Sequence, residues 1–242
     1  MKNKKKHVLV LGGSSDIGIE VVKNFLQLKW KVTTHYFKNK KKLAILKKGS
    51  RQLNLVKLNF ASHSNFNIEK LITKKFNEKY DSIINLIGYV DNKGFENTDL
   101  NSILRSLTVN AIIPILVEKK LVKKMLVQKW GRILNCSSIG VKFGGGADSY
   151  NYSLSKHCLE FIPSIYKSWA KKNVFINNLR IGMTNTKIHK RMKKNLTIKK
   201  RLKLIPINRM AQPQEISTYI VNLTTDTNSY MTGQTVILSG GE

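Results

Sequence analysis

The stretch HVLVLGGSSDIG, residues 7–18, decides the fold of this 242-residue chain. Its apolar half, His7–Leu11, has the composition of a buried strand, and an amphipathic helix is expected directly after it, over Ile17–Leu28. A glycine turn between a strand and a helix lets backbone N–H groups approach a pyrophosphate, which then faces the positive N-terminus of the helix. A tight turn with a serine or aspartate helix cap is the simpler alternative. The position and flanks of this turn favour a nucleotide-binding loop.

Short apolar runs and longer amphipathic stretches alternate along the rest of the chain. Most of the runs are near-continuous Val, Ile and Leu, as expected for strands buried on both faces of a parallel sheet. The further predicted strands are Lys31–Tyr36, Leu53–Leu58, Ser82–Ile87, Arg132–Cys136, Val174–Leu179 and Thr235–Leu238. The further predicted helices are Lys40–Lys48, Asn67–Asn77, Leu100–Gln128, Tyr150–Lys172 and Pro213–Leu223. This alternation predicts an α/β, Rossmann-type doubly wound fold: a seven-stranded parallel sheet with helices on both faces, in a single domain that covers residues 1–242.

Composition narrows the class of protein. Hydrophobic residues make up 41% of the chain and charged residues 24%, which is typical of a globular protein. No apolar run is long enough to span a bilayer, and the apolar run after the basic start is too short for a secretory signal. Two cysteines, Cys136 and Cys158, cannot form a disulfide framework. We therefore expect a cytoplasmic protein without a membrane span, and the His and Cys spacings predict no metal site.

The net charge is +29, from 43 Lys and Arg against 14 Asp and Glu. A polyanionic partner is one interpretation, because a strongly basic domain is a footprint of nucleic-acid binding. The other interpretation is that the charge only reflects a general composition rich in Lys, Asn and Ile. Composition alone does not decide between the two interpretations. The basic clusters are spread over residues 2–6, 38–48 and 187–203, and no nucleic-acid motif accompanies them. Nucleic acid is therefore an unfavoured partner.

A second candidate motif is Tyr152 followed by Lys156 within a predicted helix. Residues four apart share a helix face, so the ammonium can lie near the phenol and lower its pKa. The same spacing also occurs at Tyr36 and Tyr89, so spacing alone carries little weight in a lysine-rich chain. Only the pair at Tyr152 lies within a helix and follows a serine-rich strand end.

That strand end contains Ser138. Ligands of open α/β sheets bind beyond the carboxyl ends of the strands, where a serine hydroxyl can hydrogen-bond a substrate oxygen. A serine that merely bonds its own turn is the simpler alternative, and taken by itself this residue favours it.

These residues, together with several later segments, resemble the classical short-chain dehydrogenase/reductase family over essentially the whole chain, including its 3-oxoacyl-[acyl-carrier-protein] reductase-like members. The segments that carry the resemblance are Gly12–Gly18, Asn85–Gly88, Thr108–Asn110, Ser138, Tyr152 with Lys156, Asn177–Gly182 with Thr186, Arg209–Glu215, and Thr232–Gln234 with Gly240–Gly241. Several motifs in the family's order and at consistent intervals are far more specific evidence for the family than any one motif alone.

The resemblance implies an NAD(P)H-dependent oxidoreductase that reduces a carbonyl to a secondary alcohol, or catalyses the reverse, by hydride transfer with Tyr152 as general acid and base. Lys156 would lower the Tyr152 pKa and bind the nicotinamide ribose. Ser138 would hold the carbonyl oxygen, and Asn110 would support a water connected to Lys156. The implied cofactor-binding residues are Gly12, Ser14, Ser15, Asp16, Ile17, Gly18, Tyr36, Lys38, Asn59, Phe60, Asn85, Gly88, Tyr152, Lys156, Gly182, Thr184 and Thr186. A catalytically idle binding or regulatory protein on the same fold is the alternative, and the intact catalytic set argues against it.

The chain departs from the family pattern at several positions. Asp16 replaces the middle glycine of the cofactor loop and could instead cap the helix. Leu86 and Ile87 replace the usual Asn and Ala, and Asn59 stands where an aspartate often contacts adenine. No departure removes a catalytic group.

Cofactor choice depends on the end of the second predicted strand. A carboxylate there would bind the adenosine ribose 2′-OH and repel a 2′-phosphate. Residues 33–40 read TTHYFKNK, with no acid and with Lys38 and Lys40 following the strand. We therefore expect NADP(H) to be preferred over NAD(H), although both lysines could be ordinary solvated surface.

The basic segment 187–203 holds nine Lys and Arg residues and no acid. It falls in the variable substrate lid that the resemblance implies around residues 183–210. An anionic or acyl-carrier-linked carbonyl substrate is one interpretation of this charge, and a solvated helix face is the other. The resemblance also implies a homo-oligomer, a tetramer, and leaves the substrate itself open.

Overall fold

The computed structural model describes residues 5–61, 65–187 and 201–242. In this part of the chain, seven strands form one sheet in the order β3-β2-β1-β4-β5-β6-β7, and every neighbouring pair is parallel. The strands are β1 His7–Leu11, β2 Lys31–Tyr36, β3 Leu53–Lys57, β4 Ser82–Asn85, β5 Gly131–Ser138, β6 Val174–Ile181 and β7 Thr235–Leu238. The predicted fold class is confirmed, and each predicted strand lies within a few residues of its observed bounds.

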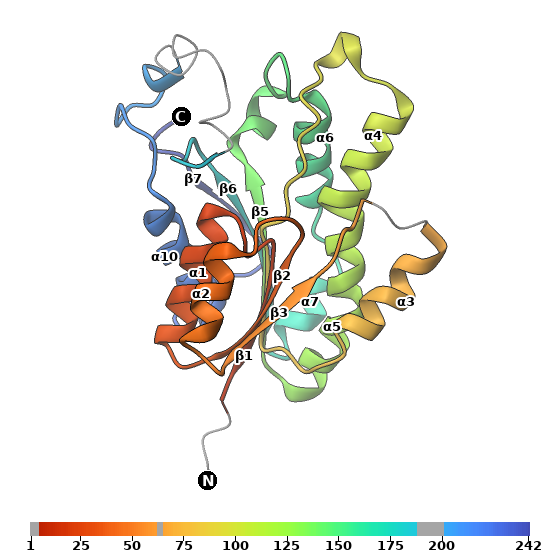
Figure 1. Ribbon diagram of the computed structural model, residues 1–242, viewed down its shortest axis with the longest axis vertical. Coiled ribbons are helices and arrows are strands. Elements are labelled where there is room, and N and C mark those ends of the chain that lie inside the picture. The colour runs from red at the N-terminus through yellow and green to blue at the C-terminus, as the bar shows by residue number, and fades with distance from the viewer. Residues whose placement is uncertain (1–4, 62–64, 188–200) are drawn as a thin grey trace.

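Helices cover both faces of the sheet (Figure 1). One face carries α1 Asp16–Gln27, α2 Lys41–Lys48 and α10 Pro213–Thr224. The other carries α3 Asn65–Lys75, α4 Leu100–Leu107, the π-helical segment η2 Thr108–Ile112, α5 Ile113–Gln128, α6 Tyr150–Leu159 and α7 Tyr166–Ala170. Short 3₁₀ segments, η1 Phe95–Asn97 and η3 Ile139–Phe143, lie in the connections before α4 and after β5.

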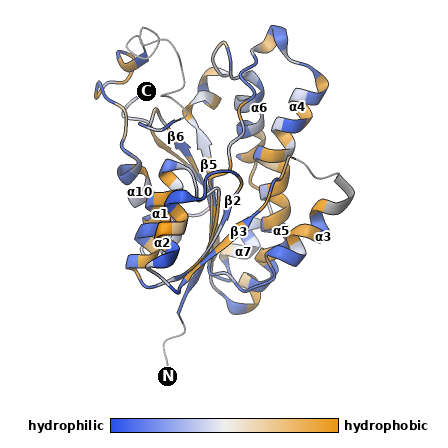
Figure 2. Cartoon of the chain, viewed as in Figure 1, coloured by the Kyte–Doolittle hydropathy of each residue, from blue (hydrophilic) through white to orange (hydrophobic). Residues whose placement is uncertain are grey.

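The core consists of two apolar layers, one on each face of the sheet. Side chains that alternate along β1 divide between them: Val8 and Val10 pack under α1, whereas Leu9 and Leu11 pack under α5. Full burial of one such side chain is worth roughly 1.5–3 kcal/mol. Figure 2 shows apolar residues along α5, and Ile113, Val117 and Leu121 of this helix pack into the core. The two layers explain why the central strands have near-continuous apolar sequences.

The strand order reverses at β1, between β2 on one side and β4 on the other. Val8 pairs with Val32 of β2 and with Ser82 of β4. In doubly wound sheets the crevice outside the carboxyl ends of the strands at such a reversal is the ligand-binding position. The glycine turn leaves β1 there, and the residues that follow β4 and β5 leave the same edge of the sheet.

The predicted helix Tyr150–Lys172 is wrong. The structure divides it into α6, which ends at Leu159, and the short α7, which begins at Tyr166. Pro163 explains the break, because proline has no N–H to donate and its ring clashes with the preceding helical turn. The intervening Phe161 is 80% exposed. The predicted helix Leu100–Gln128 is continuous, but η2 interrupts its α-helical hydrogen bonding.

Among the described residues, one helical segment, Leu100–Gln128, is long and apolar enough to cross a membrane by length and composition alone. It has 29 residues, and 39% of its most apolar window is buried. Val117 and Leu121 on this segment pack into the core against the sheet. A core helix passes the same test as a membrane span, so this segment is weak evidence for a membrane.

Candidate active site

The glycine turn forms a close backbone cradle at the start of α1. Gly12 has φ +83°, and a Cβ there would lie 2.7 Å from the Leu86 carbonyl oxygen. A Cβ on Gly18 would lie 2.6 Å from the Gly12 oxygen. Ser15 caps the helix, because its hydroxyl accepts a hydrogen bond from the Gly18 N–H at 3.0 Å. The first N–H groups of α1 therefore face outward from a turn that has room only for glycine, which fits a pyrophosphate.

Asp16 is the first residue of α1, and Ser15 is the cap, so the alternative in which Asp16 caps the helix is wrong. One Asp16 carboxylate oxygen accepts a hydrogen bond from the backbone N–H of Lys187 at 2.9 Å, and the other lies 3.4 Å from Lys42 Nζ. A carboxylate in the first turn of a helix also interacts favourably with the helix dipole. Asp16 thus joins the glycine turn to the start of the expected lid and to α2. Residues 188–200, which hold most of the basic lid segment, lie outside the described part of the chain.

Asn110 lies in η2, where one wider helical turn interrupts the long helix. Its side chain is fully buried, and its Oδ1 accepts a hydrogen bond from the Tyr89 N–H at 2.7 Å. Its Nδ2 donates to the Tyr89 oxygen at 2.9 Å and to Ser155 Oγ at 2.8 Å. Single π-helical turns of this kind occur often at functional sites. Asn110 therefore fixes the segment after β4 against α6.

Ser138 ends β5 and Tyr152 lies in the first turn of α6. The Ser138 hydroxyl lies close enough to the Tyr152 phenol to lower its pKa, as expected if both act on one oxygen. A Cβ on Gly88 would lie 3.9 Å from the Tyr152 ring, so the absence of a side chain there keeps the space beside the phenol open. Burial raises the pKa of Tyr152 to about 12, and the nearby Ser138 opposes this rise.

Lys156 is 2% exposed and lies one helical turn after Tyr152. Its Nζ donates to the carbonyl oxygens of Ile87 at 2.7 Å and Cys136 at 2.9 Å, and lies 6.0 Å from the centre of the Tyr152 ring. Burial lowers the pKa of Lys156 to about 8, whereas Cys136 and Glu160 raise it. The fold thus brings the predicted catalytic set together, with burial rather than Lys156 setting the direction of the Tyr152 pKa.

Two side chains at the end of β2 were predicted to contact the cofactor. Tyr36 is 6% exposed and packs in the core, whereas Lys38 is exposed, with its Nζ 5.2 Å from the centre of the Phe37 ring. Only Lys38 of the two side chains is thus free to reach a ligand in solvent.

The other predicted cofactor residues lie along the same edge of the sheet. Asn59 Oδ1 accepts a hydrogen bond from the Ala61 N–H at 3.1 Å, and Phe60 stacks on the buried His35 ring at 4.4 Å between centres. After β6, Thr184 is buried and donates to the Gly182 oxygen at 3.0 Å, whereas Thr186 is half-buried. Ser14 and Ile17 lie in the cradle and in the first turn of α1, both half-buried.

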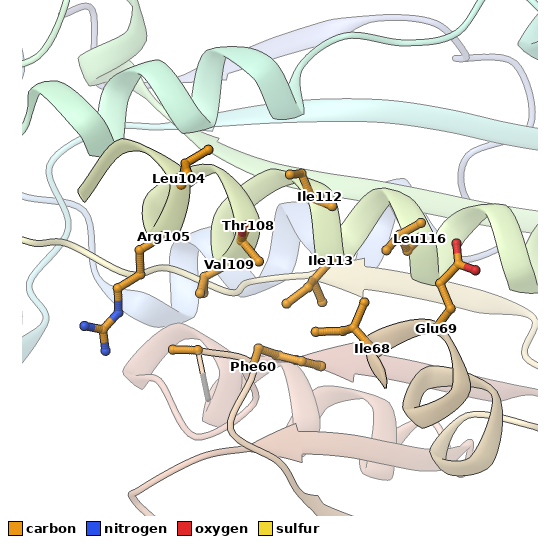
Figure 3. A pocket seen from close by; sticks show the side chains of 11 residues that line it. Phe60, Ile68, Glu69, Leu104, Arg105, Thr108, Val109, Ile112, Ile113 and Leu116 are labelled. Carbon is orange, nitrogen blue, oxygen red and sulfur yellow. The ribbon is translucent and has the colours of Figure 1, made fainter. Parts of the chain in front are cut away.

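Phe60 also lies at the edge of a hollow of about 690 Å³. Figure 3 shows Phe60 and Ile68 on one side of it and Val109 and Ile113 on the other, with the Arg105 guanidinium at one end. Its walls come from the β3–α3 connection, α3 and the helical run α4–η2–α5. Most of the residues that line the hollow are apolar, and Phe60 is the predicted cofactor residue among them.

Two residues of this network were missed by the sequence reasoning. Ser155 and the Tyr89 backbone hold Asn110, and Ser155 Oγ in turn donates to the backbone carbonyl oxygen of Tyr152 at 2.8 Å. Ser155 precedes Lys156 directly, so its place in the YxxxK stretch was the available signal. Tyr89 participates through backbone atoms, for which side-chain identity gives no signal.

Comparisons with known proteins agree with this geometry. A family model described as "Enoyl-(Acyl carrier protein) reductase" matches residues 12–242. A 3-oxoacyl-[acyl-carrier-protein] reductase of Aquifex aeolicus is 32% identical over 180 residues, which are 72% of each chain. An acetoacetyl-CoA reductase of an Acinetobacter species is 30% identical over 67% of this chain and 65% of its own.

One solved structure illustrates the likeness in fold. A 3-oxoacyl (acyl-carrier-protein) reductase from Agrobacterium tumefaciens C58, with NADP bound, superposes with a TM-score of 0.85 at 20% identity, covering 98% of this chain and 94% of its own. At this identity the likeness shows the fold alone. The family model and the Aquifex relative show more: the chain belongs to the short-chain dehydrogenase/reductase family of NAD(P)-dependent oxidoreductases.

Proposed function

We propose that this enzyme reduces a carbonyl to a secondary alcohol with NADPH, and catalyses the reverse reaction, with Tyr152 as the general acid and base. The observation that carries the proposal is the arrangement of three groups at one sheet edge. Ser138 lies close enough to Tyr152 to lower its pKa, and the Tyr152 ring is 6.0 Å from the buried Lys156 ammonium. A phenol, a hydroxyl and a buried cation at one sheet edge are the groups that a proton-transfer site requires.

The glycine cradle supports a bound dinucleotide. Side chains at Gly12 and Gly18 would collide with backbone, so their absence leaves the N–H groups at the start of α1 accessible to a pyrophosphate. Gly12–Gly18, Lys38, Phe60 and Lys156 would hold the cofactor along the edge of the sheet. When bound, it would supply the hydride.

The chain's own residues manage the proton and the developing charge. Ser138 donates a hydrogen bond to the carbonyl oxygen, which becomes more negative as reduction proceeds. Tyr152 donates its proton to that oxygen, and the Lys156 ammonium stabilises the phenolate that remains. Asn110 keeps the Tyr89 backbone in place beside the site, so that a water can reach Lys156 and resupply the proton.

The substrate class that we propose is a 3-oxoacyl thioester, either free as a coenzyme A thioester or carried on an acyl-carrier protein. The names of the Aquifex and Acinetobacter relatives support this choice. The test is a screen of ketones and acyl thioesters by loss of nicotinamide absorbance. We expect acetoacetyl thioesters to rank above simple ketones and sugars, and turnover of only unrelated ketones would contradict the substrate class.

We expect NADPH to bind more tightly than NADH, by about tenfold. No acid follows β2, and Lys38 is exposed where a 2′-phosphate would lie. An exposed ion pair is worth up to about 1 kcal/mol, so Lys38→Gln should weaken NADPH binding about fivefold and leave NADH binding unchanged. Fluorescence titration of both cofactors measures this effect. Lys48→Gln, at the far end of α2, is the matched control, and tighter binding of NADH by the parent enzyme would contradict the preference.

An acyl-carrier-linked substrate should show a salt dependence that a small thioester does not. The net charge of +29 attracts an acidic carrier protein at long range, and salt screens this attraction. Between about 50 and about 300 mM salt, we expect the KM for an acyl-carrier thioester to rise several-fold and that for the uncharged N-acetylcysteamine thioester to change less than about twofold. Equal salt responses would leave the charge without a role in substrate capture.

We further propose a single domain over residues 1–242, a substrate lid at residues 183–210, a cytoplasmic location and a homotetramer. Exposed apolar side chains on the long helix support an oligomer, because Leu104 is 49% and Ile112 is 45% exposed. Apolar surface of this kind is typical of subunit interfaces. Light scattering at micromolar concentration measures the oligomeric state.

A further inference from the structure

Glu118 is a buried carboxyl that the proposed mechanism does not use. It lies on the face of α5 that packs against the sheet, is 7% exposed, and lies beside the Asn135 side chain on β5, which lowers its pKa. Among the described residues, its Oε1 has no hydrogen-bond partner. A buried carboxyl costs several kcal/mol unless it is protonated or well paired, so a purely structural core position would favour an apolar residue.

Asn135 connects Glu118 to the residues that follow β4. Asn135 Oδ1 accepts a hydrogen bond from Asn85 Nδ2 at 3.4 Å, which leaves the Asn135 Nδ2 donor for the Glu118 carboxyl beside it. Asn85 Oδ1 in turn accepts from the Ile87 N–H at 3.2 Å. The side chains of Asn85, Asn135 and Glu118 are all buried, so their contacts form out of reach of solvent.

The last link reaches the active site. The Ile87 oxygen accepts the 2.7 Å hydrogen bond from Lys156 Nζ. Every hydrogen bond from Lys156 to Asn135 therefore has its donor on the active-site side and its acceptor on the Glu118 side, apart from the covalent step across the Ile87 residue. Hydrogen bonds that run in one direction polarise one another, and the Glu118 carbonyl oxygen can accept at the far end even when the carboxyl is protonated.

We propose that Glu118 is a positioning residue for Lys156: through Asn135, Asn85 and the Ile87 backbone, it fixes the carbonyl that holds the ammonium beside Tyr152. The inference deepens the proposed function and rests on it for its kinetic readout. Glu118 does not touch substrate or cofactor. Its effect is on where the Ile87 oxygen lies and hence on how well the ammonium is held.

The pH profile separates this role from simple packing. The groups that face Lys156 are the Cys136 thiol on β5, Tyr152 on α6 and Glu160 directly after α6. Burial raises the pKa of Cys136 and that of Tyr152 to about 12, so both are uncharged near neutrality. If the Ile87 oxygen moves away, the ammonium loses an acceptor, its pKa falls, and the alkaline limb of the kcat profile moves to lower pH.

The variants interrupt this series of hydrogen bonds at its Glu118 end. We expect Glu118→Leu and Asn135→Leu each to lower kcat about tenfold, to leave the KM for the carbonyl substrate within about twofold, and to move the alkaline limb down by about half to one pH unit. Glu118→Gln keeps an acceptor for Asn135 and should retain the parent kcat and pH limb. Val122→Ala removes packing from the same helix without changing any of these hydrogen-bonding side chains. It should leave kcat and the alkaline pH limb unchanged.

The double variant Glu118→Leu with Asn135→Leu distinguishes positioning from stability. The double variant removes the Asn135 donor together with the Glu118 acceptor and leaves Asn85 Nδ2 without its acceptor, as Asn135→Leu also does, so it should fold at least as well as Asn135→Leu. We nevertheless expect the same tenfold loss of kcat rather than a hundredfold loss, because the two single variants and the double variant interrupt the same series of hydrogen bonds. A double variant with the parent kcat would overturn the proposal, as would a Glu118→Gln variant that is as slow as Glu118→Leu.

A second readout does not need turnover. In protein labelled with ¹³C at lysine Cε, the Lys156 signal is assigned by its loss in Lys156→Arg and titrated by NMR. We expect its midpoint to fall in Glu118→Leu and to stay at the parent value in Glu118→Gln. Absence of carbonyl reduction by the parent enzyme would refute the proposed function alone. An unchanged Lys156 titration in Glu118→Leu would refute the positioning role alone.

Discussion

Replacement of Tyr152 by phenylalanine lowers kcat/KM for carbonyl reduction by at least about 100-fold, because the variant keeps the ring but has no proton to donate. The ring packs beside Gly88 and near Lys156, and removal of the hydroxyl alone should leave the fold unchanged. Cofactor affinity should also change little, since the glycine cradle and Lys156 are intact. Steady-state kinetics and a thermal melt of the two proteins measure these effects.

Tyr150→Phe is the matched control. Tyr150 lies two residues earlier on α6, where its ring packs edge-on against Phe95 with ring centres 5.0 Å apart, away from the catalytic groups. This variant should retain the parent rate. Near-full turnover by Tyr152→Phe would remove Tyr152 from the mechanism and return the catalytically idle interpretation to consideration.

Glu118→Gln stabilises the protein, and the gain grows with pH. Burial raises the pKa of the Glu118 carboxyl to about 8 from its ordinary value of 4.5. Below pH 4.5 the carboxyl is protonated in both the folded and the unfolded chain and has no effect on pH dependence. Between the two values the unfolded chain loses the proton while the folded chain keeps it, so stability falls as pH rises, and above pH 8 the loss levels off. Glutamine does not titrate and avoids this loss, which is on the order of 4 kcal/mol over the full window.

Thermal or urea unfolding at several pH values measures the difference between the parent and Glu118→Gln. The expected result is a difference that is small near pH 5 and reaches about ten degrees in Tm near pH 8. Glu69→Gln removes an exposed carboxyl from α3 and is the control for net charge. Parallel stability curves for the parent and Glu118→Gln across this range would show that the Glu118 carboxyl ionises normally in the fold.

The strand pattern was the most predictable part of the structure. Runs such as His7–Leu11 are buried on both faces, so their composition alone identifies them, and the glycine turn after β1 fixes where the sheet opens. The helix over Tyr150–Lys172 was predicted from composition without sufficient weight on Pro163, which ends the first half before Tyr166. Local backbone chemistry prevailed there over apolar periodicity.

The candidate site could be predicted as a set of residues but not as an electrostatic environment. Spacing on a helix suggested that Lys156 would lower the Tyr152 pKa, whereas desolvation at this depth raises it to about 12. The contacts among Glu118, Asn135 and Asn85 join α5, β5 and β4, which are far apart in sequence. No single-sequence pattern contains that information, because it arises only when the sheet and helix pack.

Hydride transfer to a 3-oxoacyl thioester is the central claim, and isotope transfer tests it most directly. The enzyme is incubated with acetoacetyl-CoA and NADPH that carries deuterium at both C4 positions, and the product is examined by mass spectrometry. The account predicts a 3-hydroxybutyryl thioester with one deuterium on C3, formed by the parent and at least about 100-fold more slowly by Tyr152→Phe. Failure to form the product, or product without deuterium on C3, would contradict it.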